Sequence, residues 1–214
     1  MGIFSAVLFD LDGTLIDAEE YIFSAFNYAL KQQGFPLLIR KKHAHLAGIP
    51  LRKCYPVIAP NGDVEKFVSD HRQFQLKNMH LIKKYPEMKQ VIEKTKKKGL
   101  MAGIVTSRYR ASTELVLKKI GLNNLVDVLV SGDDFAESKP SPIPFLEAIK
   151  RIGKKPVECL VVGDGCADII AGKAAGCITC RAVYGYGGKE ECSAKEDYRI
   201  NSLEEVLEII ELQL

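Results

Sequence analysis

The chain has 214 residues, of which 47% are hydrophobic, and its formal net charge is only +3. This length and composition are typical of a globular protein with one domain, or with a core domain that carries a smaller second one. No apolar segment approaches the roughly 18 residues that span a bilayer and no secretory signal is evident, so we expect a cytoplasmic protein with no membrane partner and mostly reduced cysteines.

Basic residues are concentrated in residues 18–84, which contain eleven Lys and Arg against five Asp and Glu and therefore carry a charge of +6. The rest of the chain has 19 basic and 22 acidic residues, a charge of −3. A basic segment beside an acidic one suits an anionic substrate bound by a metal in the acidic part, although a solvated lysine-rich surface would give the same pattern. A nucleic-acid partner is not expected, because no aromatic residues alternate with the basic ones and no known binding motif is present.

The first predicted element is a buried strand in "SAVLFD", residues 5–10. No convincing strand follows in residues 18–84. One face of a predicted helix there collects the apolar side chains of Ile22, Ala25, Phe26, Ala29 and Leu30. A second helix is predicted from Asp63 to Leu81. The segment is therefore predicted to be a helical insertion that returns to the sheet near Tyr85 and Pro86.

Strands and helices alternate in the remainder of the chain. Strands are predicted in "LMAGIVT", "VDVLVS", "CLVVGD" and "ITCRAV". Helices are predicted over 87–98, over 111–120, from the N-cap pair Ser141-Pro142 to 152, from "CLVVGD" to 175, and around 203–210. This alternation predicts an α/β fold with a doubly wound, Rossmann-like parallel sheet formed by residues 1–17 and 85–214. Residues 18–84 are predicted to form a small all-helical domain inserted after the first strand.

Of the six cysteines, Cys177 and Cys180 form a C-x-x-C pair that could be a redox or zinc site. The pair lies in the strand-like run "CITCRAV", whereas a reactive thiol favours a helix N-terminus. We therefore favour cysteines that pack in the core or lie at the surface.

Polar residues interrupt the apolar runs where predicted strands end, at Asp10, Thr106 and Asp164. Lys139 lies in a loop after another strand, and Asp12 follows Asp10 by two residues. Open α/β sheets bind ligands at the carboxyl ends of their strands, so we expect these five residues to converge at one edge.

Clustered carboxylates without histidine or cysteine favour a hard cation, most plausibly Mg²⁺. A lysine and a threonine hydroxyl beside them can hold anionic oxygens, which together predicts phosphoryl transfer. Asp10 is the natural nucleophile and would form an aspartyl-phosphate, while Asp12 could move protons. A Ca²⁺ loop is disfavoured, because the D-x-D-x-D-G spacing is missing and Tyr21 occupies the position of the final ligand.

The segments "DLDGT", "VTS", "SKP" and "VVGDGCAD", in this order, resemble the motifs of the haloacid dehalogenase superfamily. The resemblance covers almost the whole chain, and the helical insertion resembles the cap found after the first motif in many members. It implies that Asp10 is the nucleophile and a Mg²⁺ ligand, and that Asp12 is the general acid and base, with its backbone carbonyl also reaching the metal.

The same resemblance implies that Thr106 and Ser107 bind the transferring phosphoryl group. Lys139 would neutralise charge on that group and orient the nucleophile. Asp164 would bind Mg²⁺, and Asp168 would support the metal indirectly, through the groups around its ligands or through a water. Gly165 stands where many relatives have serine, so one polar contact of the family is in doubt.

Asp12 distinguishes among activities within the superfamily. Dehalogenases lack this second aspartate, and phosphonate-cleaving members have a small residue there. A sugar phosphomutase of the β-phosphoglucomutase type shares Asp12 but resembles "EYHF", whereas this chain has Ile22 in "EYIF". Because isoleucine cannot hydrogen-bond the acid/base carboxyl, a phosphatase is the leading hypothesis and the mutase is the alternative.

The run "LAGIPLRKCY" resembles the G-x-P-L cap segment of phosphoglycolate phosphatases and related pyrophosphatases. Arg52 and Lys53 follow it and could contact a carboxylate or a second phosphate. A small phosphorylated metabolite of the phosphoglycolate type is therefore the first candidate substrate, for a monomer or a homodimer.

A non-enzymatic function is a further alternative. Receiver domains use clustered Asp, Thr and Lys as phospho-acceptors without hydrolysis, and a binding protein could retain a dead site. Receiver domains lack such an insertion and do not have their acceptor on the first strand before "DGT", and the intact set of Asp10, Asp12, Lys139 and Asp164 disfavours a dead site. Asp133 and Asp134 are interpreted as loop residues, and the histidines as surface or packing residues of the insertion: His43, His45, His71 and His80.

Overall fold

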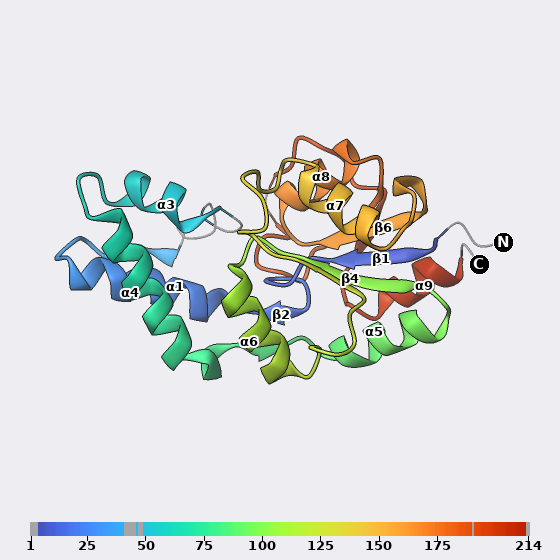
Figure 1. Ribbon diagram of the computed structural model, residues 1–214, viewed down its shortest axis with the longest axis horizontal. Helices are drawn as coiled ribbons and strands as arrows, with labels where there is room; N and C mark the ends of the chain where they lie inside the picture. Colours follow the sequence, from blue (N-terminus) through green and yellow to red (C-terminus); the bar gives the residue numbers. More distant parts are fainter. Residues whose placement is uncertain (1–3, 41–45, 47–48, 190, 213–214) are drawn as a thin grey trace.

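The computed structural model describes residues 4–40, 46, 49–189 and 191–212. Its centre is a six-stranded sheet in the order β5-β4-β1-β6-β7-β8, in which all neighbouring strands are parallel (Figure 1). The strands are β1 (Ala6–Phe9), β4 (Met101–Val105), β5 (Val128–Val130), β6 (Cys159–Gly163), β7 (Ile178–Ala182) and β8 (Tyr198–Ile200). The predicted doubly wound α/β sheet is confirmed; β8 is a short edge strand that the sequence pattern did not reveal.

Strand β1 is buried on both faces of the sheet. Val7 and Phe9 pack with α5 (Met88–Lys97), α6 (Arg110–Ile120) and α9 (Glu205–Glu211). Ala6 and Leu8 point the other way, toward α7 (Ile143–Arg151) and α8 (Cys166–Ala174). Two apolar faces explain why "AVLF" is a continuous apolar run instead of an alternating one.

The helices of residues 18–84, which we call the helical insert, pack on one another around an apolar cluster of their own. In the described part of the insert they are α1 (Glu19–Gln32), α3 (Leu51–Ile58) and α4 (Val64–Lys77), and they lie to one side of the sheet (Figure 1). Phe26, Tyr55 and Phe67 form the centre of this cluster, and the Tyr55 and Phe67 rings stack with centroids 4.6 Å apart. The insert therefore has a core that is separate from the two clusters covering the sheet.

The boundary of the insert differs from the prediction in two places. Lys83–Lys84 form β3, which pairs antiparallel with β2 (Ile16–Asp17), so the expectation of no strand in residues 18–84 is wrong at this point. Two exposed lysines carry no apolar pattern, and only the partner strand defines their pairing. The helix predicted to reach Leu81 ends at Lys77, where the side chain of Asn78 donates to the carbonyl of Phe74 (2.9 Å), and a 3₁₀ turn continues to Leu81.

The start of α7 also differs from the prediction by one residue. Ser141 is the predicted N-cap, but α7 begins at Ile143 and its N-cap is Pro142. Ser141 instead accepts the N–H of Ile143 through its hydroxyl (3.4 Å). None of the helices in the described part of the chain has the length and apolar character needed to cross a bilayer.

The four free cysteines are all buried: Cys54, Cys159, Cys177 and Cys180. Cys177 and Cys180 belong to the apolar clusters on opposite faces of the sheet, so packing is confirmed over a paired redox or metal site. Burial raises the pKa of the Cys177 thiol to about 12, which keeps it protonated and unreactive.

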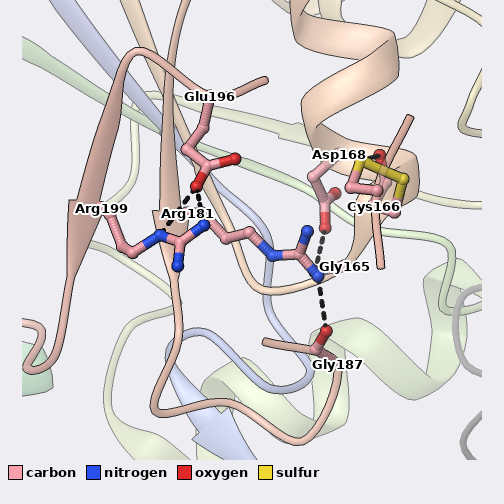
Figure 2. The surroundings of a disulfide bond; sticks show 8 residues. Gly165, Cys166, Asp168, Arg181, Gly187, Glu196 and Arg199 are labelled. Atoms are coloured by element: carbon pink, nitrogen blue, oxygen red, sulfur yellow. Dashed lines mark hydrogen bonds and ion pairs between the residues drawn. A yellow bond between two sulfur atoms is a disulfide. The ribbon is translucent and has the colours of Figure 1, made fainter. Parts of the chain in front are cut away.

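Cys166 and Cys192 are the exceptions to the expectation of mostly reduced cysteines, since they form a disulfide. Figure 2 shows this bond at the start of α8, where it joins the helix to the loop that follows β7. Arg181 holds the same loop by donating from Nη2 to the carbonyl of Gly187 (2.9 Å). The two cysteines are 26 residues apart and form no local motif, so the tertiary structure alone brings them together.

We expect a thiol reductant to lower the free energy of unfolding by about 3 kcal/mol, because the bond closes a chain segment of 26 residues and so restricts the unfolded state. Urea and thermal unfolding with and without dithiothreitol measure this change. The matched control is Cys192→Ser. Its free energy of unfolding should equal that of the reduced wild type and should not change when the reductant is added. Equal stability of the wild type in both conditions would contradict the contribution assigned to the disulfide.

Candidate functional site

The carboxyl ends of three adjacent strands place the predicted site residues side by side. Asp10 follows β1, Thr106 follows β4 and Asp164 follows β6, and β1 lies between the other two strands. The chain enters the sheet at β1 and then crosses to opposite sides, so this edge is the switch point where open α/β sheets bind ligands. The expected convergence is present in the structure.

Lys139 is buried at the centre of this edge. Its Nζ donates to Asp10 Oδ1 (2.6 Å), Asp168 Oδ1 (2.6 Å) and the carbonyl of Val105 (3.1 Å). These partners use all three hydrogens of the ammonium group. Burial by itself would lower the pKa of Lys139, but the two carboxylates outweigh it and raise the pKa, so the lysine stays charged.

The Asp164 side chain is surrounded by the backbone of two glycine-containing turns. Its Oδ2 accepts the N–H of Gly187 (2.7 Å), and its own N–H donates to Thr14 Oγ1 (3.1 Å). Gly13, with φ +91°, approaches so closely that a Cβ there would lie 2.1 Å from Asp164 Oδ2. Only glycine fits at position 13, so the "DGT" turn and the third acid are packed as one unit.

Asp168 lies on the first turn of α8 and makes two separate contacts. One carboxylate oxygen accepts from Lys139, and the other accepts the N–H of Gly165 (3.1 Å), which caps the helix. Gly165 therefore contributes backbone rather than a side chain at the position where the resemblance suggests serine.

Three buried carboxylates, those of Asp10, Asp164 and Asp168, each offer an oxygen within 4.8 Å of the others. Burial is the largest influence on Asp10 and raises its pKa to about 7; Asp168 and Asp12 add to the rise and Lys139 opposes it. Burial, then Asp10 and Asp168, raise the pKa of Asp164 well above its usual range. One ammonium does not balance three carboxylates, and a hard cation with oxygen ligands fits the remaining charge.

The Asp12 carboxylate lies apart from this group and pairs with Arg108. Arg108 Nε and Nη2 donate to the two Asp12 oxygens at 2.9 and 2.5 Å, and Nη1 donates to Ser112 Oγ (3.0 Å). The Arg108 guanidinium also lies 5.1 Å from the centre of the Tyr21 ring. This forked pair fixes the direction in which the Asp12 carboxylate points.

Sequence reasoning missed Arg108, although it directly follows the "VTS" strand end that was singled out. An arginine in a loop is usually exposed, and only the fold shows that this one is buried against Asp12.

The two predicted phosphate-binding hydroxyls have different surroundings. Thr106 Oγ1 accepts the backbone N–H of Arg108 (3.1 Å). Ser107 Oγ is buried and has no hydrogen-bond partner among the described residues. An unpaired buried hydroxyl is costly in a folded protein, so Ser107 has a donor and acceptor available for a ligand.

A cleft of about 280 Å³ lies between the sheet edge and the helical insert, and all of these carboxylates and Lys139 line it. Arg52 lines it from the insert, but its side chain is 60% exposed and pairs with Glu65. Lys53 is exposed and is not among the described residues that line the cleft. Tyr186, a second residue that sequence reasoning missed, lines the cleft near Asp12 and Asp164.

The other polar residues considered from the sequence, two aspartates and the histidines, have the structural roles expected for them wherever the structure describes them. Asp133 and Asp134 lie in a loop and bind Arg110. His71 is buried in the insert, where its Nδ1 lies 2.8 Å from the Tyr55 hydroxyl, and His80 is exposed. His43 and His45 lie outside the described residues.

Comparison with known proteins places this site in context. Residues 7–182 match the family described as haloacid dehalogenase-like hydrolase. The chain is 35% identical over 181 residues to the phosphoglycolate phosphatase of Aquifex aeolicus, covering 84% of this chain and 85% of the relative. It is 33% identical over 208 residues to the pyrophosphatase PpaX of Bacillus cereus, covering 96% of each chain.

A crystal structure from Haemophilus somnus, of a chain named as a predicted phosphoglycolate phosphatase, superposes with a TM-score of 0.84 at 25% identity. The superposition covers 98% of this chain and 99% of that one, so the helical insert and the sheet are both shared.

Proposed function

Because the chain belongs to the haloacid dehalogenase-like hydrolase family, we propose that it is a Mg²⁺-dependent phosphatase that hydrolyses a small phosphorylated metabolite through an aspartyl-phosphate on Asp10. The observation that carries the proposal is the buried arrangement of Asp10, Asp164 and Asp168 around Lys139, with Asp12 held separately by Arg108. The arrangement supplies a nucleophile, a cation site and a proton carrier at one edge of the cleft.

In the proposed first step, a carboxylate oxygen of Asp10 attacks phosphorus while the bond from phosphorus to the leaving oxygen breaks. Lys139, fixed by its three hydrogen bonds, orients Asp10 and offsets charge on the phosphoryl oxygens. Ser107 and Thr106 lie beside the nucleophile, where their hydroxyls can bind the same oxygens. Asp12, which enters the cycle protonated and is reprotonated in the second step, gives its proton to the leaving oxygen.

In the second step Asp12 takes a proton from water, and the water oxygen attacks phosphorus. The anhydride bond to Asp10 breaks, inorganic phosphate leaves and the Asp10 carboxylate is restored. Arg108 keeps Asp12 aimed at the same place for both steps. Asp10, Asp164 and Asp168 would hold Mg²⁺, with the Asp12 backbone carbonyl, and the ion would neutralise charge on the carboxylates and the phosphoryl group.

We assign residues 18–84 as a cap domain over the core of residues 1–17 and 85–214. The separate apolar cluster of the insert supports this division, as does the narrow connection through β2 and β3. A cap with its own core could move as a unit and exclude water from the cleft during reaction.

Phosphoglycolate is the first candidate substrate and pyrophosphate the second, in line with the names of the relatives from Aquifex aeolicus and Bacillus cereus. The phosphomutase alternative is weaker because Ile22 lines the cleft without a polar group. A non-hydrolytic phospho-acceptor is disfavoured because Asp12 lines the same cleft as Asp10, where it could activate water. A phosphate-release assay over phosphoglycolate, pyrophosphate, nucleotides and hexose phosphates tests these candidates together.

Mg²⁺ should stabilise the protein against heat, because it relieves repulsion among three buried carboxylates. Differential scanning fluorimetry with EDTA and then with excess Mg²⁺ measures the shift in Tm. Asp164→Asn should lose most of that shift, whereas Glu93→Gln, which changes an exposed carboxylate paired with Lys89, should retain it. An unchanged shift in Asp164→Asn would remove this residue from the metal site.

Asp10→Asn should reduce hydrolysis of a small aryl phosphate by about 1000-fold or more, because the amide cannot act as the nucleophile. Steady-state kinetics with Mg²⁺ measure the loss, with circular dichroism as the control for folding. A folded variant that retains turnover would show that another group attacks phosphorus.

Asp12→Asn should accumulate phosphorylated enzyme, because water is no longer activated to hydrolyse the anhydride on Asp10. Intact-mass spectrometry after acid quench detects the added phosphoryl group, and peptide mapping assigns it to a residue. Absence of the adduct together with unchanged steady-state turnover would contradict the role of Asp12.

A further inference from the structure

Four lysine and arginine side chains line the cleft within the described chain: Arg52, Arg72, Arg108 and Lys139. Apart from the proposed Mg²⁺, these side chains are the positive charges that an anionic substrate would meet in the cleft. The ion pairs that these side chains already make therefore indicate which of them is free to bind an anionic group of the substrate.

Three of the four are already neutralised. Lys139 binds Asp10 and Asp168, and Arg108 binds both oxygens of Asp12. Arg52 binds both oxygens of Glu65 through Nε (2.8 Å) and Nη2 (2.7 Å).

Arg72 differs from the others. Among the described residues no carboxylate lies within ion-pair distance of it, and its Nε is buried with no hydrogen-bond acceptor. Its guanidinium lies 4.0 Å from the centre of the Tyr109 ring. Arg72 belongs to α4 of the insert, and Tyr109 follows β4 in the core, so the pair crosses from one wall of the cleft to the other.

This stacking orients Arg72 without using its hydrogen bonds. An arginine on an aromatic face is held through the flat surface of the guanidinium, which leaves the N–H groups at its edge free to donate. Those donors match the two oxygens of a carboxylate or phosphate. A buried, oriented donor with no acceptor is the feature expected of a site completed by a ligand.

We propose that Arg72 is a specificity-determining residue, which binds a second anionic group of the substrate while the reacting phosphoryl group lies at Asp10 and Lys139. The preferred substrates are then small phosphate esters or anhydrides that carry a carboxylate or another phosphate. This assignment rests on the proposed phosphatase function and deepens it. It also places the second anion at Arg72 and not at Arg52 or Lys53, because Arg52 would first have to release Glu65 and Lys53 does not reach the cleft lining.

Binding of non-hydrolysable probes tests the assignment without depending on turnover. Phosphonoacetate carries one carboxylate beside its phosphonate, methylenediphosphonate carries a second phosphonate, and methylphosphonate carries no second anionic group. Isothermal titration calorimetry with Mg²⁺ gives the Kd of each probe for the wild type, Arg72→Gln and Arg72→Lys. The matched control is Lys66→Gln, which removes a positive charge from the same helix where it pairs with Asp70.

The wild type should bind at least one of the doubly anionic probes about 10- to 100-fold more tightly than methylphosphonate, the usual size of a charge-assisted contact. Arg72→Gln should lose that preference and keep its affinity for methylphosphonate, Arg72→Lys should recover part of it, and Lys66→Gln should behave as the wild type. The two doubly anionic probes distinguish a carboxylate from a phosphate as the second group.

The assignment is overturned if the wild type shows no preference for a doubly anionic probe, or if Arg72→Gln retains the preference. It is also overturned if Arg72→Gln weakens all three probes equally, or if Arg52→Ala abolishes the preference instead. Failure of the phosphatase function is distinguishable, because it would leave the wild type unable to hydrolyse aryl phosphate whatever the probes show.

Discussion

The contact of Lys139 with Asp10 and Asp168 is the interaction on which the site depends. Three carboxylates within 4.8 Å of one another, buried at the edge of a sheet, repel strongly because little solvent screens them. One ammonium at 2.6 Å from two of them offsets part of this repulsion and fixes their oxygens. The remaining imbalance appears as the raised pKa of Asp10 and of Asp164. This imbalance is the physical basis of the proposed Mg²⁺ site, because a hard cation with oxygen ligands would relieve it.

The rest of the core holds these charges in place. Parallel strands β4, β1 and β6 end at the same level, and the consecutive apolar residues of β1 point to the two faces in turn and anchor it on both. Gly13 lets the "DGT" turn come against Asp164, and the loop after β7 returns to donate a backbone N–H to the same carboxylate. The disulfide ties that loop to α8, the helix that presents Asp168.

The helical insert contributes different chemistry. Its own apolar cluster lets it fold against itself, so the face turned toward the sheet edge can carry polar and charged side chains such as Arg72. The core and the insert therefore present side chains of opposite net charge to the cleft. In the proposed function, the acidic sheet edge binds the cation and the reacting phosphoryl group, and the basic insert binds the second anionic group of the substrate.

Several features followed from the sequence alone. The alternation of apolar runs and helical periods determined the parallel sheet, and acids at the ends of those runs determined where the site lies, because both depend on local patterns. The partners of Arg108, Arg72 and Cys166 depended on tertiary structure. Each contact joins segments that are far apart in the chain, and an isolated arginine or cysteine carries no pattern that identifies its partner. "LFDLDGTLID" thus contains two acids, and the family resemblance already implied that Lys139 orients Asp10. Only the fold decided that Asp12 would pair with Arg108, because that contact joins two segments without a shared pattern.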